Sequence, residues 1–159
     1  MSRKQPNSKN CFVCGVENQN GLRLAFYDTA PGRVEARWTA YSHFQGFPGI
    51  AHGGIIAAVL DEAATRTVFG ADGSSRLVVT ASLEIRYRKP VPLETELIVV
   101  GMLQEDKGEI ILTSSHIEDK QGNIYATAHA VLVESPPELA KTLVLSSDDW
   151  QVYPDGEDL

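Results

Sequence analysis

The stretch HGGIIAAVLDE, residues 52–62, decides the fold because it opens the one convincing helix pattern in the chain. Apolar side chains recur through it at spacings of three and four residues, and no proline occurs from residue 53 to residue 68. This spacing predicts an amphipathic helix with one buried face. Gly70 and Gly73 follow and predict where the helix ends.

Outside the helix, the sequence pattern predicts strands. Before it, apolar residues alternate over 22–26 and over 34–38, and Pro31-Gly32 between them predicts a hairpin turn. After it, four segments rich in Val, Ile, Thr and Tyr predict antiparallel strands joined by short turns. These four segments are residues 77–87, 94–104, 109–117 and 126–133.

Composition excludes several classes of protein. The 159 residues suit one domain. The formal net charge of −7 argues against a nucleic-acid partner, because no basic excess exists to neutralise phosphates. No apolar run approaches the roughly 20 residues of a membrane span, and the N-terminus lacks the apolar core of a signal peptide. With only two cysteines, we expect a cytoplasmic protein that contacts no membrane.

Two strands, one long helix and about four further strands predict an α+β domain in which a curved antiparallel sheet wraps a central helix. This order resembles the hotdog fold, and residues 52–62 resemble the HGG…D signature of PaaI-type hotdog thioesterases. Residues 11–24, 79–92 and 122–133 resemble other segments of that family. We therefore expect a flexible tail over 1–10, a hotdog thioesterase domain over 11–135 and an acidic tail over 136–159. Leu143 and Leu145 are candidates for a short edge strand in that tail.

The resemblance implies hydrolysis of an acyl-CoA thioester to a carboxylate and free CoA, with no cofactor besides the CoA of the substrate. It implies that Asp61 is the nucleophile or general base and that the Gly53 N–H binds the thioester oxygen. A helix N-terminus supplies such a donor, and Gly53-Gly54 lets a carbonyl approach the backbone closely. Gly53 and Asp61 are eight residues apart, about 12 Å along one helix. One carbonyl cannot reach both, so we expect a homodimer with shared sites, and dimers can pair further into a homotetramer.

Three further polar residues near this motif are candidates for a role in the site. His52 is a candidate base, but its place at the helix entrance favours a cap. Glu62 is a candidate substrate contact, but Arg66 four residues on favours a helix ion pair. Gln45 is the candidate for orienting water, since Gly46 stands where the family often has Asn or Gln.

Other residues are candidates for contacting the substrate. Thr80 aligns with a hydroxyl residue that assists some relatives, and a strand threonine on a pleat is the equal alternative. Arg86, Arg88 and Lys89 are candidates for the CoA phosphates, or they form a charged outer face of the sheet. Aromatic and aliphatic candidates for the acyl pocket are Phe44, Phe47, Ile50, Ala58 and Phe69.

Cys11 and Cys14 are spaced as half of a zinc site. A structural zinc needs four ligands and the chain has no second CxxC, so we predict no metal and two small buried side chains. Two other functions stay open for the chain. The first is a non-catalytic binder of acyl-CoA or fatty-acyl groups. The second is a hydroxyacyl thioester dehydratase, although Ala57 stands where such an enzyme would have the helix acid that pairs with His43.

Overall fold

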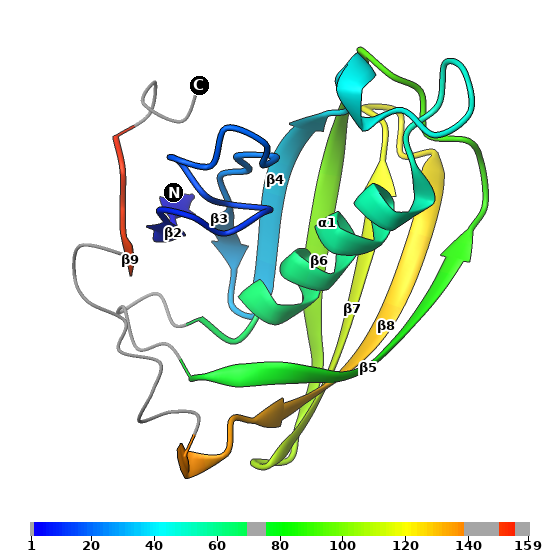
Figure 1. The fold of residues 1–159 in the computed structure, drawn as a ribbon. Helices are drawn as coiled ribbons and strands as arrows, with labels where there is room; N and C mark the ends of the chain where they lie inside the picture. Colours follow the sequence, from blue (N-terminus) through cyan, green and yellow to red (C-terminus); the bar gives the residue numbers. More distant parts are fainter. Residues whose placement is uncertain (1, 70–75, 139–149, 155–159) are drawn as a thin grey trace.

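The computed structural model describes residues 2–69, 76–138 and 150–154. One α-helix lies across the inner face of a curved antiparallel sheet, as predicted (Figure 1). The strand order in that sheet is β1-β3-β4-β6-β7-β8-β5, and β2 and β9 form a separate pair. The elements are β1 (Arg3–Lys4), β2 (Asn7–Ser8), β3 (Tyr27–Ala30), β4 (Arg33–Thr39), a 3₁₀ turn (Ser42–Phe44), α1 (Gly53–Arg66), β5 (Val78–Tyr87), β6 (Glu96–Asp106), β7 (Ile110–Glu118), β8 (Ile124–Glu134) and β9 (Trp150–Gln151).

The predicted strands after the helix are confirmed, and one before it is not. β4 buries Val34, Ala36 and Trp38 on one face, which matches their alternation. The alternation over 22–26, by contrast, does not form a strand, because β3 begins only at Tyr27. Residues 22–26 form an irregular segment that buries Leu24 and Phe26. The Leu24 N–H donates to the Val13 carbonyl oxygen of a loop rather than to a strand of the main sheet.

The helix lies unusually close to the sheet. A Cβ added to Gly101 on β6 would lie only 2.1 Å from the Ala63 carbonyl oxygen, so only glycine fits there. On β7, the Ser115 hydroxyl donates a 2.8 Å hydrogen bond to the Leu60 carbonyl oxygen in the buried interior. These contacts fix the rotation of α1 about its axis, and therefore the side on which Asp61 emerges.

The N-terminal segment packs onto the domain and is not the loose tail that its polarity predicts. Asn7 is fully buried, and its side-chain amide donates to the carbonyl oxygens of Cys14 at 2.8 Å and Leu24 at 2.9 Å. Gln5 is 2% exposed and donates to the Arg66 carbonyl oxygen at 3.1 Å. The polar side chains satisfy backbone groups that burial would otherwise leave unpaired.

The described part of the C-terminal segment also pairs with the domain. Trp150 and Gln151 form β9 against β2, although the tail over 136–159 was not expected to pack. The candidate edge at Leu143 and Leu145 lies outside the described residues, as do the predicted helix terminators at positions 70 and 73. α1 ends at Arg66, with Thr67 as its C-cap. No helix among the described residues is long and apolar enough to cross a bilayer.

Candidate active site

The first turn of α1 presents a backbone donor. His52 is the N-cap with extended dihedral angles (φ −64°, ψ 135°), and its Nδ1 accepts a 3.0 Å hydrogen bond from the Gly54 N–H. This geometry agrees with the predicted capping role of His52. The Gly53 N–H has no hydrogen-bond partner among the described residues. It is therefore available to an external acceptor at the positive end of the helix dipole.

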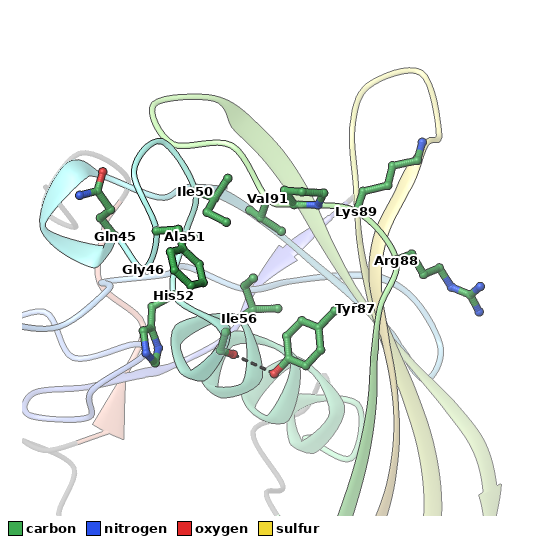
Figure 2. A pocket seen from close by; sticks show the side chains of 13 residues that line it. Gln45, Gly46, Ile50, Ala51, His52, Ile56, Tyr87, Arg88, Lys89 and Val91 are labelled. Carbon is green, nitrogen blue, oxygen red and sulfur yellow. Dashed lines mark hydrogen bonds between the residues drawn. The ribbon is translucent and has the colours of Figure 1, made fainter.

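A cavity of about 670 Å³ lies beside this turn (Figure 2). Its walls come from the 45–52 loop, from Tyr87 at the end of β5 and from residues 88–91 that follow it, with Gly53 and Ile56 contributed by α1. Figure 2 shows the Tyr87 ring pointing toward the start of the helix, where its hydroxyl donates a 2.9 Å hydrogen bond to the Gly53 carbonyl oxygen. Tyr87 thus joins the sheet to the first helical turn at the cavity.

Asp61 occupies a different environment, two turns further along α1. Asp61 is not among the described residues that line this cavity. Its Oδ1 accepts a 2.7 Å hydrogen bond from the Thr80 hydroxyl on β5. Burial raises the pKa of the Asp61 carboxyl above its usual value, and the Thr80 hydrogen bond opposes that shift. A half-buried carboxylate held by one hydroxyl keeps its second oxygen available for chemistry.

Glu62 forms the predicted ion pair within the helix. Its Oε1 lies 2.9 Å from Nε of Arg66, whose side chain is completely buried. Rings of Phe26, Phe69 and Trp150 surround the Arg66 guanidinium at 4.8–5.4 Å from their centroids. Glu62 therefore faces the N-terminal segment, and the structure does not bring it to the cavity.

Three of the predicted loop residues line the cavity, and three other acyl-pocket candidates do not. Gln45 and Phe47 both line the cavity, but the Gln45 side chain accepts a 3.0 Å hydrogen bond from the Gly49 N–H of its own loop. Phe47 is 78% exposed, an unusual value for a phenylalanine. Ile50 also lines the cavity. The other acyl-pocket candidates, Phe44, Ala58 and Phe69, do not line it.

Two of the three basic candidates reach the cavity. The N–H groups of Arg88 and Lys89 both donate to the Tyr125 carbonyl oxygen, which bends the chain after β5 and carries these two residues to the rim. Arg86 stays on the strand, does not line the cavity and pairs with Glu84 at 3.3 Å. Tyr87, the last residue of β5, also lines the cavity, although it was not among the residues predicted to contact the substrate.

Comparison with known proteins agrees with this architecture. The model of the thioesterase superfamily matches residues 48–126. Acyl-coenzyme A thioesterase THEM4 of Rattus norvegicus is 31% identical over 137 residues, which cover 85% of this chain and 58% of the relative. A solved thioesterase superfamily protein, RHA08564, is 28% identical with a TM-score of 0.71, and the match covers 79% of this chain and 63% of that chain.

The chain therefore belongs to the thioesterase superfamily. It spans little more than half the length of the rat relative. The fold, though not the sequence, is also close to smu.793 of Streptococcus mutans, solved bound to acetyl CoA, with 18% identity, a TM-score of 0.63 and coverage of 70% of this chain and 88% of that one.

The capping role of His52 predicts a specific pattern of stabilities. His52→Ala removes the acceptor for the Gly54 N–H and should lower the free energy of unfolding by about 1 kcal/mol. His52→Asn supplies another good N-cap acceptor and should stay within about 0.5 kcal/mol of the wild type. Urea denaturation followed by circular dichroism measures both values. Equal losses in the two variants would show that the ring is needed for something other than the cap.

Proposed function

We propose that this chain is a thioesterase that hydrolyses acyl-CoA to a carboxylate and free CoA, at sites shared between two copies of the chain. One observation carries the proposal: the cavity contains an unpaired backbone donor at Gly53 but no carboxylate from α1, because Asp61 lies two turns away. The names of the curated relatives support the substrate class, and so does the acetyl CoA bound to smu.793, a protein of similar fold.

The Gly53 N–H binds the thioester carbonyl oxygen in this proposal. As the carbonyl carbon becomes tetrahedral, its oxygen gains negative charge, which a fixed N–H at a helix start stabilises. Tyr87 does not contact the charged oxygen in this proposal. Its hydroxyl donates to the Gly53 carbonyl oxygen and so holds the first helical turn in place. Ile50, Ile56 and Val91 give the cavity an apolar wall for the substrate chain.

Asp61 of the partner copy completes the site. In one mechanism its carboxylate attacks the carbonyl carbon, expels the CoA thiolate and forms an anhydride that water then hydrolyses. In the other it takes a proton from a water that attacks the carbonyl carbon, and the tetrahedral intermediate then breaks its C–S bond and releases the CoA thiolate. The Thr80 hydroxyl fixes Oδ1 in either case and leaves Oδ2 for the reaction.

The basic residues at the cavity rim suit the phosphates of CoA. Arg88 and Lys89 extend from the segment after β5, and Figure 2 shows their side chains directed away from the helix start. Phosphate groups bound there would leave the thioester end of a long ligand free to reach Gly53. Arg86 lies on β5 outside the cavity lining, where it pairs with Glu84, and this proposal gives it no phosphate contact.

A homodimer follows from the separation of the two catalytic groups. β5 lies at the end of the main sheet and pairs only with β8 among the described strands. A second copy placed across a two-fold axis beside this edge would set the two helices antiparallel, with Gly53 of one chain facing Asp61 of the other. Further pairing of dimers is compatible with this arrangement.

Neutralising the carboxylate should abolish turnover while the protein stays folded. Asp61→Asn should slow thiol release from a panel of acyl-CoAs at least about 100-fold, the scale of general acid–base catalysis, and should leave ligand binding intact. Glu105→Gln, the matched neutralisation of an exposed acid on β6, should keep the wild-type rate. A colorimetric thiol reagent measures release, and calorimetry measures binding. A wild-type chain that binds acyl-CoA without releasing thiol would instead be a binding protein, and an enoyl absorbance change without thiol would indicate a dehydratase.

Removing the backbone donor should have a comparable effect. Gly53→Pro deletes the N–H at the first helical position, where proline is tolerated, and the extended backbone of His52 accepts a following proline. Its kcat should fall about 100- to 1,000-fold. Gly53→Ala is the matched control, because its Cβ would meet Tyr87 at an ordinary 3.6 Å and the N–H remains. Equal activity of the two variants, both checked for thermal stability, would rule out the proposed oxyanion donor.

A further inference from the structure

A second cluster of reactive side chains lies on α1, outside the cavity. Cys11 and Cys14 of the N-terminal segment face Glu62, and the two Sγ atoms and a carboxylate oxygen all lie within 4.8 Å of one another. Sγ of Cys11 is 3.9 Å from Oε2 of Glu62. None of the three side chains lines the cavity or takes part in the proposed hydrolysis.

The cysteines sit on a tight turn that exposes backbone donors to sulfur. The Gly15 N–H donates to the Cys11 carbonyl oxygen at 2.9 Å, and a Cβ at Gly15 would lie 2.2 Å from that oxygen, so the turn requires glycine. The Val13 N–H points at Cys11 Sγ at 3.4 Å. Sγ of Cys11 therefore already accepts a backbone hydrogen bond. Zinc binding would itself displace the protons of both thiols, since thiolate is the form that binds the metal.

We propose that Cys11, Cys14 and Glu62 bind a zinc ion, with water as the fourth ligand. Zinc prefers thiolate sulfur and takes carboxylate oxygen, and its bonds of about 2.3 and 2.1 Å keep tetrahedral ligand atoms roughly 3.5–3.8 Å apart. The cluster needs to contract by only about 1 Å to meet that geometry. The prediction of no metal counted only the two cysteines, because the third ligand is 51 residues away in the sequence.

The surroundings suit the charge and coordination of this ion. Two thiolates and one carboxylate outweigh a zinc ion by one negative charge. The buried Arg66 guanidinium, 2.9 Å from the other oxygen of Glu62, balances it and orients the carboxylate. Cys14 is fully buried, whereas the Glu62 side chain is 19% exposed and Cys11 is partly exposed. Water therefore has access to the fourth position.

The metal would fasten the N-terminal segment to the helix beside Asp61. Gln5 already donates to the Arg66 carbonyl oxygen, and the Arg66 guanidinium donates to the Pro6 carbonyl oxygen. A zinc ion at Glu62 would add a third link between this segment and α1, one residue from the proposed catalytic carboxylate. This link between the segment and the helix does not depend on the hydrolytic proposal.

Cobalt(II) tests the site, because it replaces zinc and its thiolate bonds absorb in the near ultraviolet. The full chain, purified under reducing conditions without chelator, should contain about one zinc per chain. After zinc is stripped, titrated cobalt should give a thiolate charge-transfer band and the visible bands of tetrahedral coordination. Cys11→Ser should lose about half of the charge-transfer intensity, since one of two thiolates is gone. Glu62→Gln should weaken cobalt affinity at least about tenfold, while the neighbouring Asp61→Asn should bind as the wild type does.

Two further measurements use the wild-type chain and do not depend on the variants folding. Saturating zinc should raise the melting temperature of the stripped protein by roughly 5–10 °C and protect both thiols from alkylation. Absence of zinc in the purified chain together with absence of a cobalt–thiolate band would overturn the proposal. So would formation of a Cys11–Cys14 disulfide at the same rate with and without zinc, because bound thiolates are shielded from oxidation.

Discussion

The separation of Gly53 and Asp61 along α1 is the constraint on which the proposed active site depends. Gly53 and Asp61 are separated by eight residues, and an α-helix spans about 12 Å over that length. Gly101 and Ser115 hold α1 against the sheet, so the helix cannot bend to bring the two groups together. The donor opens into a cavity and the carboxylate emerges two turns later beside Thr80. A site that uses both must be completed by a second chain.

Local patterns in the sequence predicted most of the fold. The strands after the helix lie within about two residues of their predicted bounds, because their alternation and turn residues are local signals. The packing of Gln5 and Asn7 was not predictable in this way. Those amides are buried by hydrogen bonds to carbonyl groups that only the folded chain brings near them. Residues 22–26 show the opposite error, since their alternation reports burial without strand pairing.

The same division applies to the sites. The capping position of His52 and the Glu62–Arg66 pair follow from helix spacing, and the structure has both. The Thr80 contact with Asp61 joins two elements. Family resemblance made Thr80 a candidate, but it did not predict this contact. The approach of Cys11 and Cys14 to Glu62, and the position of Tyr87 at the cavity, depend on how the N-terminal segment and β5 pack on α1. No spacing within the sequence encodes them.

Mixing two inactive variants tests most directly whether the active site is shared between chains. Asp61→Asn and Gly53→Pro are unfolded together in equal amounts, refolded and assayed for thiol release. A mixed dimer with shared sites has one site in which both groups are intact, so random pairing should restore about a quarter of the wild-type activity. Each variant refolded alone should stay inactive. A mixture that remains as inactive as its components would contradict the account, because it would place both groups of each site in one chain.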